Sequence, residues 1–227
     1  MKYEESTKPA EKAIYFKDRV DAGLQLAKAI DRYAHYDSVV MALPRGGIVL
    51  GYEVARHLHS PLGLVLVRKI GHPLNPEYAI GAVAEDGEPI FNHSNMDDIS
   101  ETWLMIAKQE AQQMIEQRRK IYYPLETVPI DLGSKTVILV DDGIATGLTM
   151  EASIGAIKKQ NPALIVVAVP VAPVDALTRL KNLVDDVVVL VDPRLFLGSV
   201  GAHYRDFHQI NDSTVRQLLD EANSTNL

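Results

Sequence analysis

Residues 137–149 read VILVDDGIATGLT, and this stretch decides how the rest of the chain is interpreted. An uninterrupted apolar run, of the kind that forms a buried strand, ends in two adjacent carboxylates, Asp141 and Asp142. A short loop with glycines and threonines follows. Adjacent carboxylates repel each other, and burial raises their pKa values further. Such a pair is typical of a site where a ligand compensates the charge.

On both sides of this stretch, apolar strands alternate with helices. The first helix is predicted to bury Val20, Leu24, Ala27 and Ala34. A hairpin with strands near 79–84 and 88–91 is predicted within a long loop at 72–92. The alternation favours an α/β fold with a parallel sheet of about five strands and helices on both faces. The pattern predicts strands at 38–43, 62–67, 135–140, 163–172 and 186–191, and helices at 18–34, 48–58, 99–121, 147–160, 173–182 and 212–222.

The unusual residues of the chain fall where the predicted strands end. PRGG at 44–47 follows the first strand, RKIG at 68–71 follows the second, and the acidic pair with its loop follows the third. In open parallel sheets, ligands bind at the carboxyl ends of the strands. We therefore expect one active cleft at that edge of the sheet.

The loop at 143–149 has the properties of an anion site. It leads into a helix whose first N–H groups lack intrahelical partners, and the helix dipole also favours negative charge there. Gly143 and Gly147 allow close approach of the backbone, and Thr146 and Thr149 add hydroxyl donors. A phosphate monoester fits this description. The loop lacks the GK[ST] of a Walker A motif, and an ordinary strand–turn–helix with a threonine cap is the alternative.

Taken together, the acidic pair and its loop resemble the signature of type I phosphoribosyltransferases. The resemblance extends in element order over about 38–191, and the motifs PRGG, RKIG and VDDGIATG are similar to a subgroup of standalone predicted phosphoribosyltransferases with no settled acceptor. It implies one domain over 1–227 with a Rossmann-like core at about 38–191, a lid hairpin, and a small hood. The hood is formed by the chain ends, about 1–20 and 192–227.

The resemblance implies 5-phosphoribosyl-1-pyrophosphate (PRPP) as a ligand. Asp141 and Asp142 would accept hydrogen bonds from the ribose hydroxyls. At position 145 this chain lacks the aspartate that 6-oxopurine transferases often use as a general base, which speaks against hypoxanthine or guanine as the acceptor. The 5-phosphate would be held by the loop residues Ala145, Thr146, Gly147, Leu148 and Thr149.

The same resemblance implies a pyrophosphate site and a Mg²⁺ cofactor. Arg45, Gly46 and Gly47 would bind the pyrophosphate through a basic side chain and backbone amides. Mg²⁺ neutralises charge on the leaving group and is commonly held through substrate phosphates. Asp141 or Asp142 would touch its shell, directly or through water, without forming a metal site from protein alone.

The lid and the hood supply further candidates. Lys69 would neutralise pyrophosphate, with Arg68 as the second candidate, and one of Glu77, Glu85 and Asp86 would act as acid or base; a solvated hairpin is the alternative. Three aromatic residues would stack on the acceptor, with packing inside the tail as the alternative: Phe196, Tyr204 and Phe207. A metal held by His203, Asp206 and His208 is less favoured, because no further ligand is nearby.

Composition narrows the class of protein. The net charge is −7 and the pI about 5.5, so no basic footprint indicates a nucleic-acid partner. Cysteine is absent, which excludes disulfides and thiolate catalysis. The polar amino-terminal segment and the lack of a long apolar run predict a cytoplasmic protein with no membrane partner.

These features predict an enzyme of nucleotide or nucleoside metabolism that transfers a phosphoribosyl group between PRPP and a nitrogenous base or similar acceptor. A homodimer is implied by the resemblance alone. Two alternatives stay open: a module that senses PRPP or nucleotides without catalysis, and hydrolysis of a phosphoribosyl compound by water.

Overall fold

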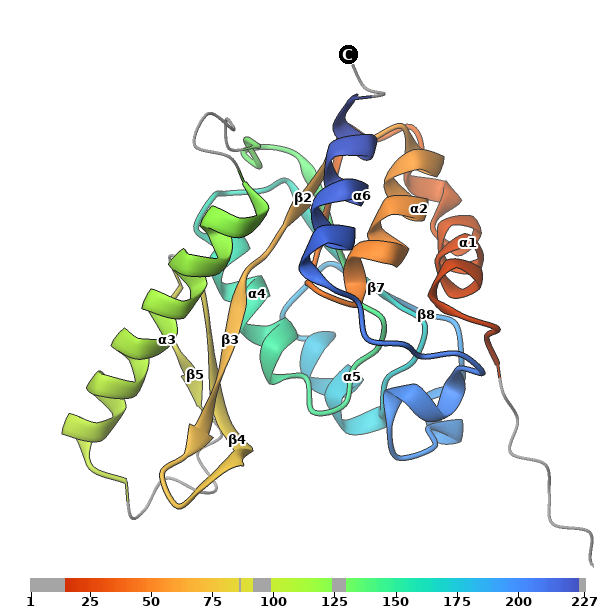
Figure 1. Ribbon diagram of the computed structural model, residues 1–227. Coiled ribbons are helices and arrows are strands. Elements are labelled where there is room, and N and C mark those ends of the chain that lie inside the picture. The colour runs from red at the N-terminus through yellow and green to blue at the C-terminus, as the bar shows by residue number, and fades with distance from the viewer. Residues whose placement is uncertain (1–14, 86, 92–98, 124–129, 225–227) are drawn as a thin grey trace, which may run out of the picture.

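The computed structural model describes residues 15–85, 87–91, 99–123 and 130–224, apart from the side chains at positions 76 and 77. A five-stranded parallel sheet with the order β2-β1-β6-β7-β8 forms its centre (Figure 1). The predicted α/β fold and strand number are therefore confirmed. The strands of this sheet are β1 (Ser38–Ala42), β2 (Leu62–Leu64), β6 (Thr136–Val140), β7 (Leu164–Val169) and β8 (Asp186–Val189).

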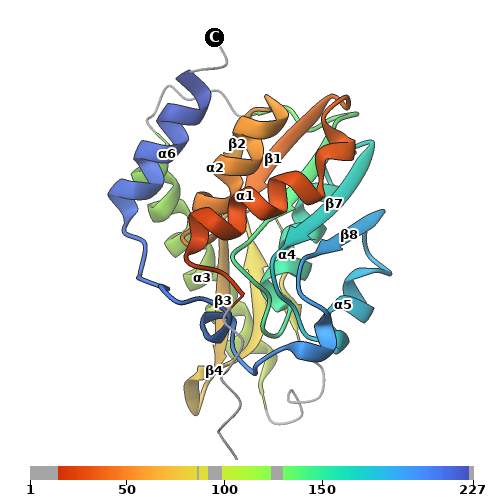
Figure 2. The ribbon, with the colours of Figure 1, turned by 90° about the vertical axis from the view of Figure 1, so that its right-hand side faces the viewer.

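Helices cover both faces of this sheet because its strands are apolar on both sides. Successive residues of β1, such as Val39 and Val40, belong to different hydrophobic clusters. One face carries α1 (Arg19–Ala29), α2 (Gly47–Leu58) and α6 (Asp212–Ser224), and the other carries α4 (Leu148–Lys158) and α5 (Val174–Leu180) (Figure 2). This two-sided burial is typical of parallel sheets.

The lid is a separate antiparallel sheet. It contains β3 (Val67–His72), β4 (Asn75–Ala84) and β5 (Ile90–Phe91), and it lies between α3 (Glu101–Tyr122) and α4. The predicted strand at 62–67 was wrong at its end, since β2 stops at Leu64 and the chain enters β3 at Val67. Arg68 and Lys69 consequently lie inside a lid strand and not at the end of a strand of the parallel sheet.

The first helix buries only part of the predicted face, and it ends at Ala29, before Ala34. Asp18 caps α1 by accepting a hydrogen bond from the Asp21 N–H at 2.9 Å. The buried side of α1 is formed by Ala22, Leu26 and Ala27, whereas Val20 and Leu24 are exposed. Small residues let α1 pack closely on α2: a Cβ on Gly23 would lie 3.0 Å from the Cα of Leu50.

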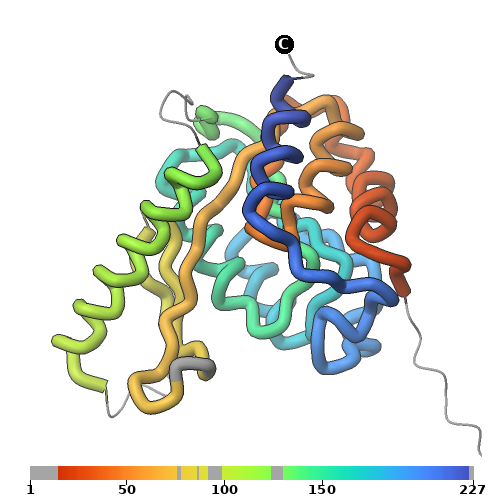
Figure 3. The backbone as a smooth tube through the Cα atoms, in the orientation of Figure 1, coloured from red at the N-terminus to blue at the C-terminus, as the bar shows by residue number. Residues whose placement is uncertain are grey.

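The two chain ends meet beside the parallel sheet. The backbone tube shows the carboxyl-terminal tail passing the start of α1 before it enters α6 (Figure 3). Phe16 forms a β-bridge with Tyr204, and the N–H groups of Arg205 and Asp206 donate to the carbonyls of Phe16 and Lys17 at 2.9 Å. The tail also contains the short 3-10 helices η3 (Pro193–Leu195) and η4 (Val200–His203). Two described stretches of the predicted hood, around Phe16 and Tyr204, therefore pair with each other, whereas α6 packs against α2. Residues 1–14 and 225–227 lie outside the described residues. Within the described ranges, each helix is too short or too polar to cross a bilayer.

Candidate active site

The two loops that the sequence singled out meet at the carboxyl ends of β1 and β6. These strands are parallel neighbours with Ala42 opposite Val140, so the residues that follow each strand lie side by side. The Leu43 N–H donates to the Val140 carbonyl at 2.9 Å, which continues the pairing by one residue. Strand register thus places the 44–47 loop directly beside the acidic pair, and the single active cleft stays a prediction.

Gly46 and Gly47 are required by this close approach. A Cβ on Gly46 would lie 1.9 Å from Oδ2 of Asp142, and one on Gly47 would lie 2.8 Å from the Val140 carbonyl oxygen. Both distances are shorter than real Cβ contacts, so a side chain at either position forces its neighbour to move. The peptide bond between Pro44 and Arg45 is cis. Because Gly46 and Gly47 have no side chains, the backbone of the 44–47 loop packs directly against the acidic pair.

Burial and mutual repulsion both act on the two carboxylates of the acidic pair. Burial raises the pKa of Asp141, and the neighbouring charge of Asp142 raises it further, while Lys69 and Arg19 act in the opposite direction. Burial also raises the pKa of Asp142, against the nearby guanidinium of Arg19. The Asp142 N–H donates to Oδ1 of Asp141 at 2.8 Å, which fixes the two carboxylates relative to each other. Hydroxyl donors or a cation arriving with a ligand would relieve this repulsion.

Arg19 is a site residue that the sequence reasoning missed. Its Nε donates to Oδ2 of Asp142 at 2.8 Å, its Nη1 donates to the His208 carbonyl at 2.6 Å, and its guanidinium lies 3.7 Å from the ring centroid of Phe207. It is only 9% exposed. A cation in the first turn of a helix opposes the helix dipole, so helix patterning gives no reason to expect one buried there.

The loop at 143–149 enters α4 in the way an anion site requires. Gly147 has a φ of 89°, in the left-handed region, and caps the helix that begins at Leu148. Ala145 and Thr146 are exposed, and Thr149 is half-buried at the mouth of the cleft. Since the capping residue has no side chain, the first N–H groups of α4 remain available to a ligand.

The basic candidates gather around a cavity of about 430 Å³ next to these loops. Arg68, Lys69, Pro44 and Thr149 line it, and the charge of Lys69 acts on Asp141 across the cleft. Arg45 is partly exposed, and its Nη1 lies 4.0 Å from a carboxylate oxygen of Asp212 at the start of α6. Arg68 and Lys69 therefore line this cavity, and Arg45 approaches it through its contact with Asp212, which also lines it.

Comparison with known proteins decides the family. A family model described as the phosphoribosyl transferase domain matches residues 17–202. The chain belongs to the phosphoribosyl transferase domain family. The match covers the parallel sheet, the antiparallel sheet and the first part of the tail, so the resemblance identified from the acidic pair and its loop is confirmed.

Relatives of this phosphoribosyl transferase domain cover most of its length. Two curated proteins from two strains of Mycobacterium tuberculosis, provisionally named phosphoribosyl transferases, are each 40% identical to it over 211 residues. Those residues are 91% of this chain and 47% of each relative, so the chain spans about half the length of the curated relatives it matches. A crystal structure of a Thermus thermophilus protein is 39% identical, with a TM-score of 0.77, and the match covers 91% of this chain and 98% of that one.

Glu85 lines a different cavity from Arg68 and Lys69. It forms an ion pair with Arg119 at 3.1 Å and lines a second cavity of about 600 Å³ at the β2 edge of the sheet, together with Tyr123. The N–H of Glu85 donates to the Leu66 carbonyl at 2.9 Å, and Leu66 lines both cavities. The predicted acid–base role of Glu85 stays a prediction. Asp86 and the side chain of Glu77 lie outside the described residues.

The three aromatic candidates differ in their surroundings. Tyr204 is 5% exposed, and its hydroxyl donates to the backbone carbonyl of Asp142 at 2.6 Å, so the packing alternative applies to this residue. Phe207 is 36% exposed with one ring face against Arg19, and Phe196 stacks on His203 at 5.4 Å between centroids. Tyr204 and Phe207 therefore contact Asp142 and its partner Arg19, respectively. An acceptor role stays a prediction for Phe196 and Phe207.

A metal site on the hood histidines has no support. Nε2 of His203 accepts a hydrogen bond from the Leu197 N–H at 3.0 Å, and His208 pairs with Asp206 at 2.9 Å. Across the described part of the chain, no group of three histidine or acidic residues is arranged to hold an ion. His203 is instead a buried structural histidine.

Acidification is expected to destabilise the hood through His203. Burial lowers the pKa of His203, and protonation of Nε2 would remove its bond to Leu197. Because the folded pKa lies below the unfolded value of about 6.5, this stability is present above that value and is lost as the pH falls through the window below it. The melting temperature should fall more steeply with decreasing pH in the wild type than in His203→Gln, whose amide oxygen accepts the same N–H without titrating. Equal slopes would contradict this role.

Proposed function

We propose that the domain catalyses Mg²⁺-dependent transfer of a phosphoribosyl group between PRPP and a nitrogenous base or similar acceptor, with pyrophosphate as the leaving group. The observation that carries the proposal is the contact between the two loops, where a Cβ on Gly46 would overlap the Asp142 carboxylate. A ligand that spans both loops needs phosphate at each end and hydroxyl donors between them. PRPP has that distribution of groups.

Each part of the cleft has a role in this proposal. The first N–H groups of α4 and the hydroxyls of Thr146 and Thr149 hold the 5-phosphate. Asp141 and Asp142 accept hydrogen bonds from the ribose hydroxyls, which relieves the repulsion that raises the pKa of Asp141. Binding the ribose at these carboxylates orients its anomeric carbon for in-line transfer.

The pyrophosphate end is positive and partly enclosed. Backbone amides of the 44–47 loop, with Arg45 and Lys69, bind the leaving group, and Arg68 lines the same cavity. Since Lys69 lies on the lid strand β3, binding of pyrophosphate also draws the lid sheet over the cleft. Closure excludes water from the oxocarbenium-like anomeric carbon.

The described side chains fit a Mg²⁺ ion that arrives with the substrate. Asp142 is already paired with Arg19, and the described residues form no cluster of three acidic or histidine side chains for an ion. Mg²⁺ keeps several waters and is usually bound through substrate phosphates, so such a cluster is not needed. When bound, the ion would supply charge neutralisation on the departing pyrophosphate, with Asp141 or Asp142 touching its shell.

Titration calorimetry with Mg²⁺ and PRPP tests this proposal. We expect saturable binding to one site per chain below about 1 mM ligand, and weaker binding when EDTA removes the metal. Ribose 5-phosphate and pyrophosphate, titrated separately, should each bind more weakly than PRPP because each occupies one loop. No heat of binding with PRPP at this concentration would contradict the proposed function.

A sensor of PRPP or nucleotides is the second candidate. Position 145 is alanine and Glu85 is paired with Arg119 in the other cavity, so neither of these positions supplies a general base beside the acidic pair. A panel of nucleobases with Mg²⁺ and PRPP, followed by pyrophosphate release, separates the candidates. Turnover with one base supports transfer, binding without turnover across the panel supports sensing, and release without any base indicates hydrolysis.

A further inference from the structure

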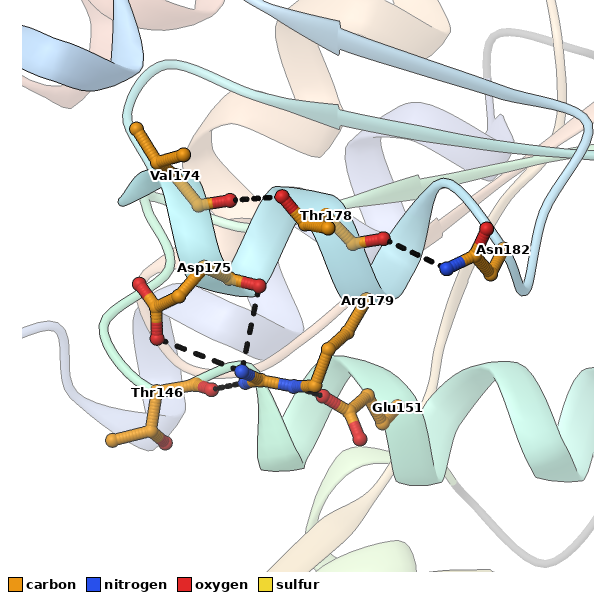
Figure 4. A network of polar contacts seen from close by, with 7 residues as sticks. All are labelled: Thr146, Glu151, Val174, Asp175, Thr178, Arg179 and Asn182. Atoms are coloured by element: carbon orange, nitrogen blue, oxygen red, sulfur yellow. Dashed lines mark hydrogen bonds and ion pairs between the residues drawn. The ribbon is translucent and has the colours of Figure 1, made fainter.

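A network of polar contacts joins the loop at 143–149 to α4 and α5 (Figure 4). Arg179 on α5 reaches across to α4, where its Nε donates to Oε1 of Glu151 at 2.8 Å. Its Nη2 donates to the backbone carbonyl of Thr146, and its Nη1 lies 3.5 Å from a carboxylate oxygen of Asp175. One guanidinium therefore joins the loop, the first turn of α4, and α5.

Glu151 places a negative charge close to the expected phosphate position. It lies in the first turn of α4, and its side chain is only 11% exposed. Its Oε1 would be 3.3 Å from a Cβ on Gly147, so the carboxylate sits directly behind the loop. A carboxylate there interacts well with the helix dipole, but it repels a phosphate at the same helix end. Arg179 supplies the positive charge that offsets it.

The bond to Thr146 also fixes the direction of the loop backbone. Across a trans peptide unit, the carbonyl and the following N–H point in opposite directions. Because the Thr146 carbonyl points back to Arg179, the Gly147 N–H points to the front of the loop. The left-handed φ of Gly147 continues this turn into the helix. The guanidinium thus holds a donor toward the place where an anion binds.

We propose that Arg179 is a positioning residue for the phosphate loop: it neutralises Glu151 and holds the Thr146 carbonyl backward, so that the loop presents N–H donors to a sugar phosphate monoester. This inference rests on the proposed function only for the ligand of the loop, the 5-phosphate. Arg179 acts through the loop and does not touch the phosphate itself. The sequence alone gave no indication of this role, because the contact joins residues 33 positions apart.

A double-mutant comparison tests the proposal by ribose 5-phosphate binding, which needs neither an acceptor nor turnover. Calorimetry is carried out on the wild type, Arg179→Gln, Glu151→Gln and the double variant. Lys181→Gln, two residues further along at the end of α5, is the control that removes one positive charge. Pyrophosphate is titrated into each protein as the second ligand, and the melting temperature of each variant reports on folding.

Arg179→Gln should weaken ribose 5-phosphate binding about tenfold because Glu151 is left uncompensated. Pyrophosphate binding, and all binding by Lys181→Gln, should stay within about twofold of the wild type. Adding Glu151→Gln should restore most of the lost affinity, even where the melting temperature is not restored. Equal losses for both ligands, no loss, or no rescue in the double variant would overturn the proposal. If the wild type itself bound pyrophosphate but not ribose 5-phosphate, the loop assignment in the proposed function would fail together with this inference.

Discussion

Gly46→Ala is expected to weaken PRPP binding by about 100-fold or more. The new methyl group would lie 1.9 Å from Oδ2 and 2.6 Å from Cγ of Asp142, so the two groups cannot keep their positions. Asp142 has little freedom to yield, because Arg19 holds its carboxylate at 2.8 Å. Either the acidic pair or the 44–47 loop must move, and both belong to the proposed PRPP site.

The backbone itself does not cause this loss. Gly46 has a φ of −65° and a ψ of −41°, which alanine adopts readily. The expected effect on stability is therefore that of local overpacking, about 1–3 kcal/mol. Calorimetry with Mg²⁺ and PRPP, together with urea denaturation, separates the two effects.

Gly155→Ala is the matched control for this substitution. Gly155 lies inside α4, and its added Cβ would meet only the Cδ1 of Ile90 at 3.9 Å, within ordinary contact distance. Alanine in a helix interior should raise stability by about 0.5–1 kcal/mol and leave PRPP binding unchanged. Wild-type affinity in a folded Gly46→Ala variant would show that the two loops do not act as one site.

The two carboxylates are expected to respond to amide substitution with opposite changes in stability. Asp141→Asn should stabilise the free protein at neutral pH by about 0.5–2 kcal/mol, a size common for relief of strain at functional sites. Its amide oxygen can still accept the Asp142 N–H, while the repulsion between the carboxylates disappears. Asp142→Asn should destabilise the protein by about 1–3 kcal/mol, since it leaves the buried Arg19 guanidinium without its counter-ion.

Both variants are expected to lose PRPP binding, because each removes an anionic acceptor for the ribose hydroxyls. Urea denaturation and calorimetry measure the two properties on the same protein samples. Destabilisation by Asp141→Asn, or full PRPP affinity in either variant, would contradict the account of the acidic pair.

The stability gain of Asp141→Asn should also depend on pH. Because the folded protein raises the pKa of Asp141, it retains this proton at pH values where the unfolded chain has lost it. Ionisation of Asp141 therefore reduces stability as the pH rises from about 3.9 through the raised pKa. The gap between variant and wild type should be widest at neutral pH and shrink as the solution is acidified.

Local patterns in the sequence predicted the parallel sheet and its two loops. An apolar run that ends in charged or glycine-rich residues indicates a buried strand and predicts the end at which a ligand binds. The register of β1 with β6 then brings 44–47 and 141–149 together without further information. The break between β2 and β3 was not visible, because Val65 and Leu66 stay apolar and buried while the chain leaves one sheet for the other.

The side-chain contacts that the sequence did not reveal join distant segments of the chain. Arg19 reaches Asp142 across 123 positions, and Glu85 is held by Arg119 across 34 positions. The exposed face of α1, with Val20 and Leu24, was mistaken for the buried one because small residues such as Ala22 and Gly23 do the packing against α2. Periodicity reports which residues are apolar, whereas the buried face depends on which partner helix is present.

A crystal structure of the wild-type protein with Mg²⁺ and PRPP tests the central claim most directly. The account predicts the 5-phosphate at the first turn of α4 on residues 145–149, the ribose hydroxyls at Asp141 and Asp142, and the pyrophosphate on the 44–47 loop facing Lys69. Density that placed the diphosphate elsewhere while the 44–47 loop stayed free of ligand would contradict the claim that these two loops form one PRPP site.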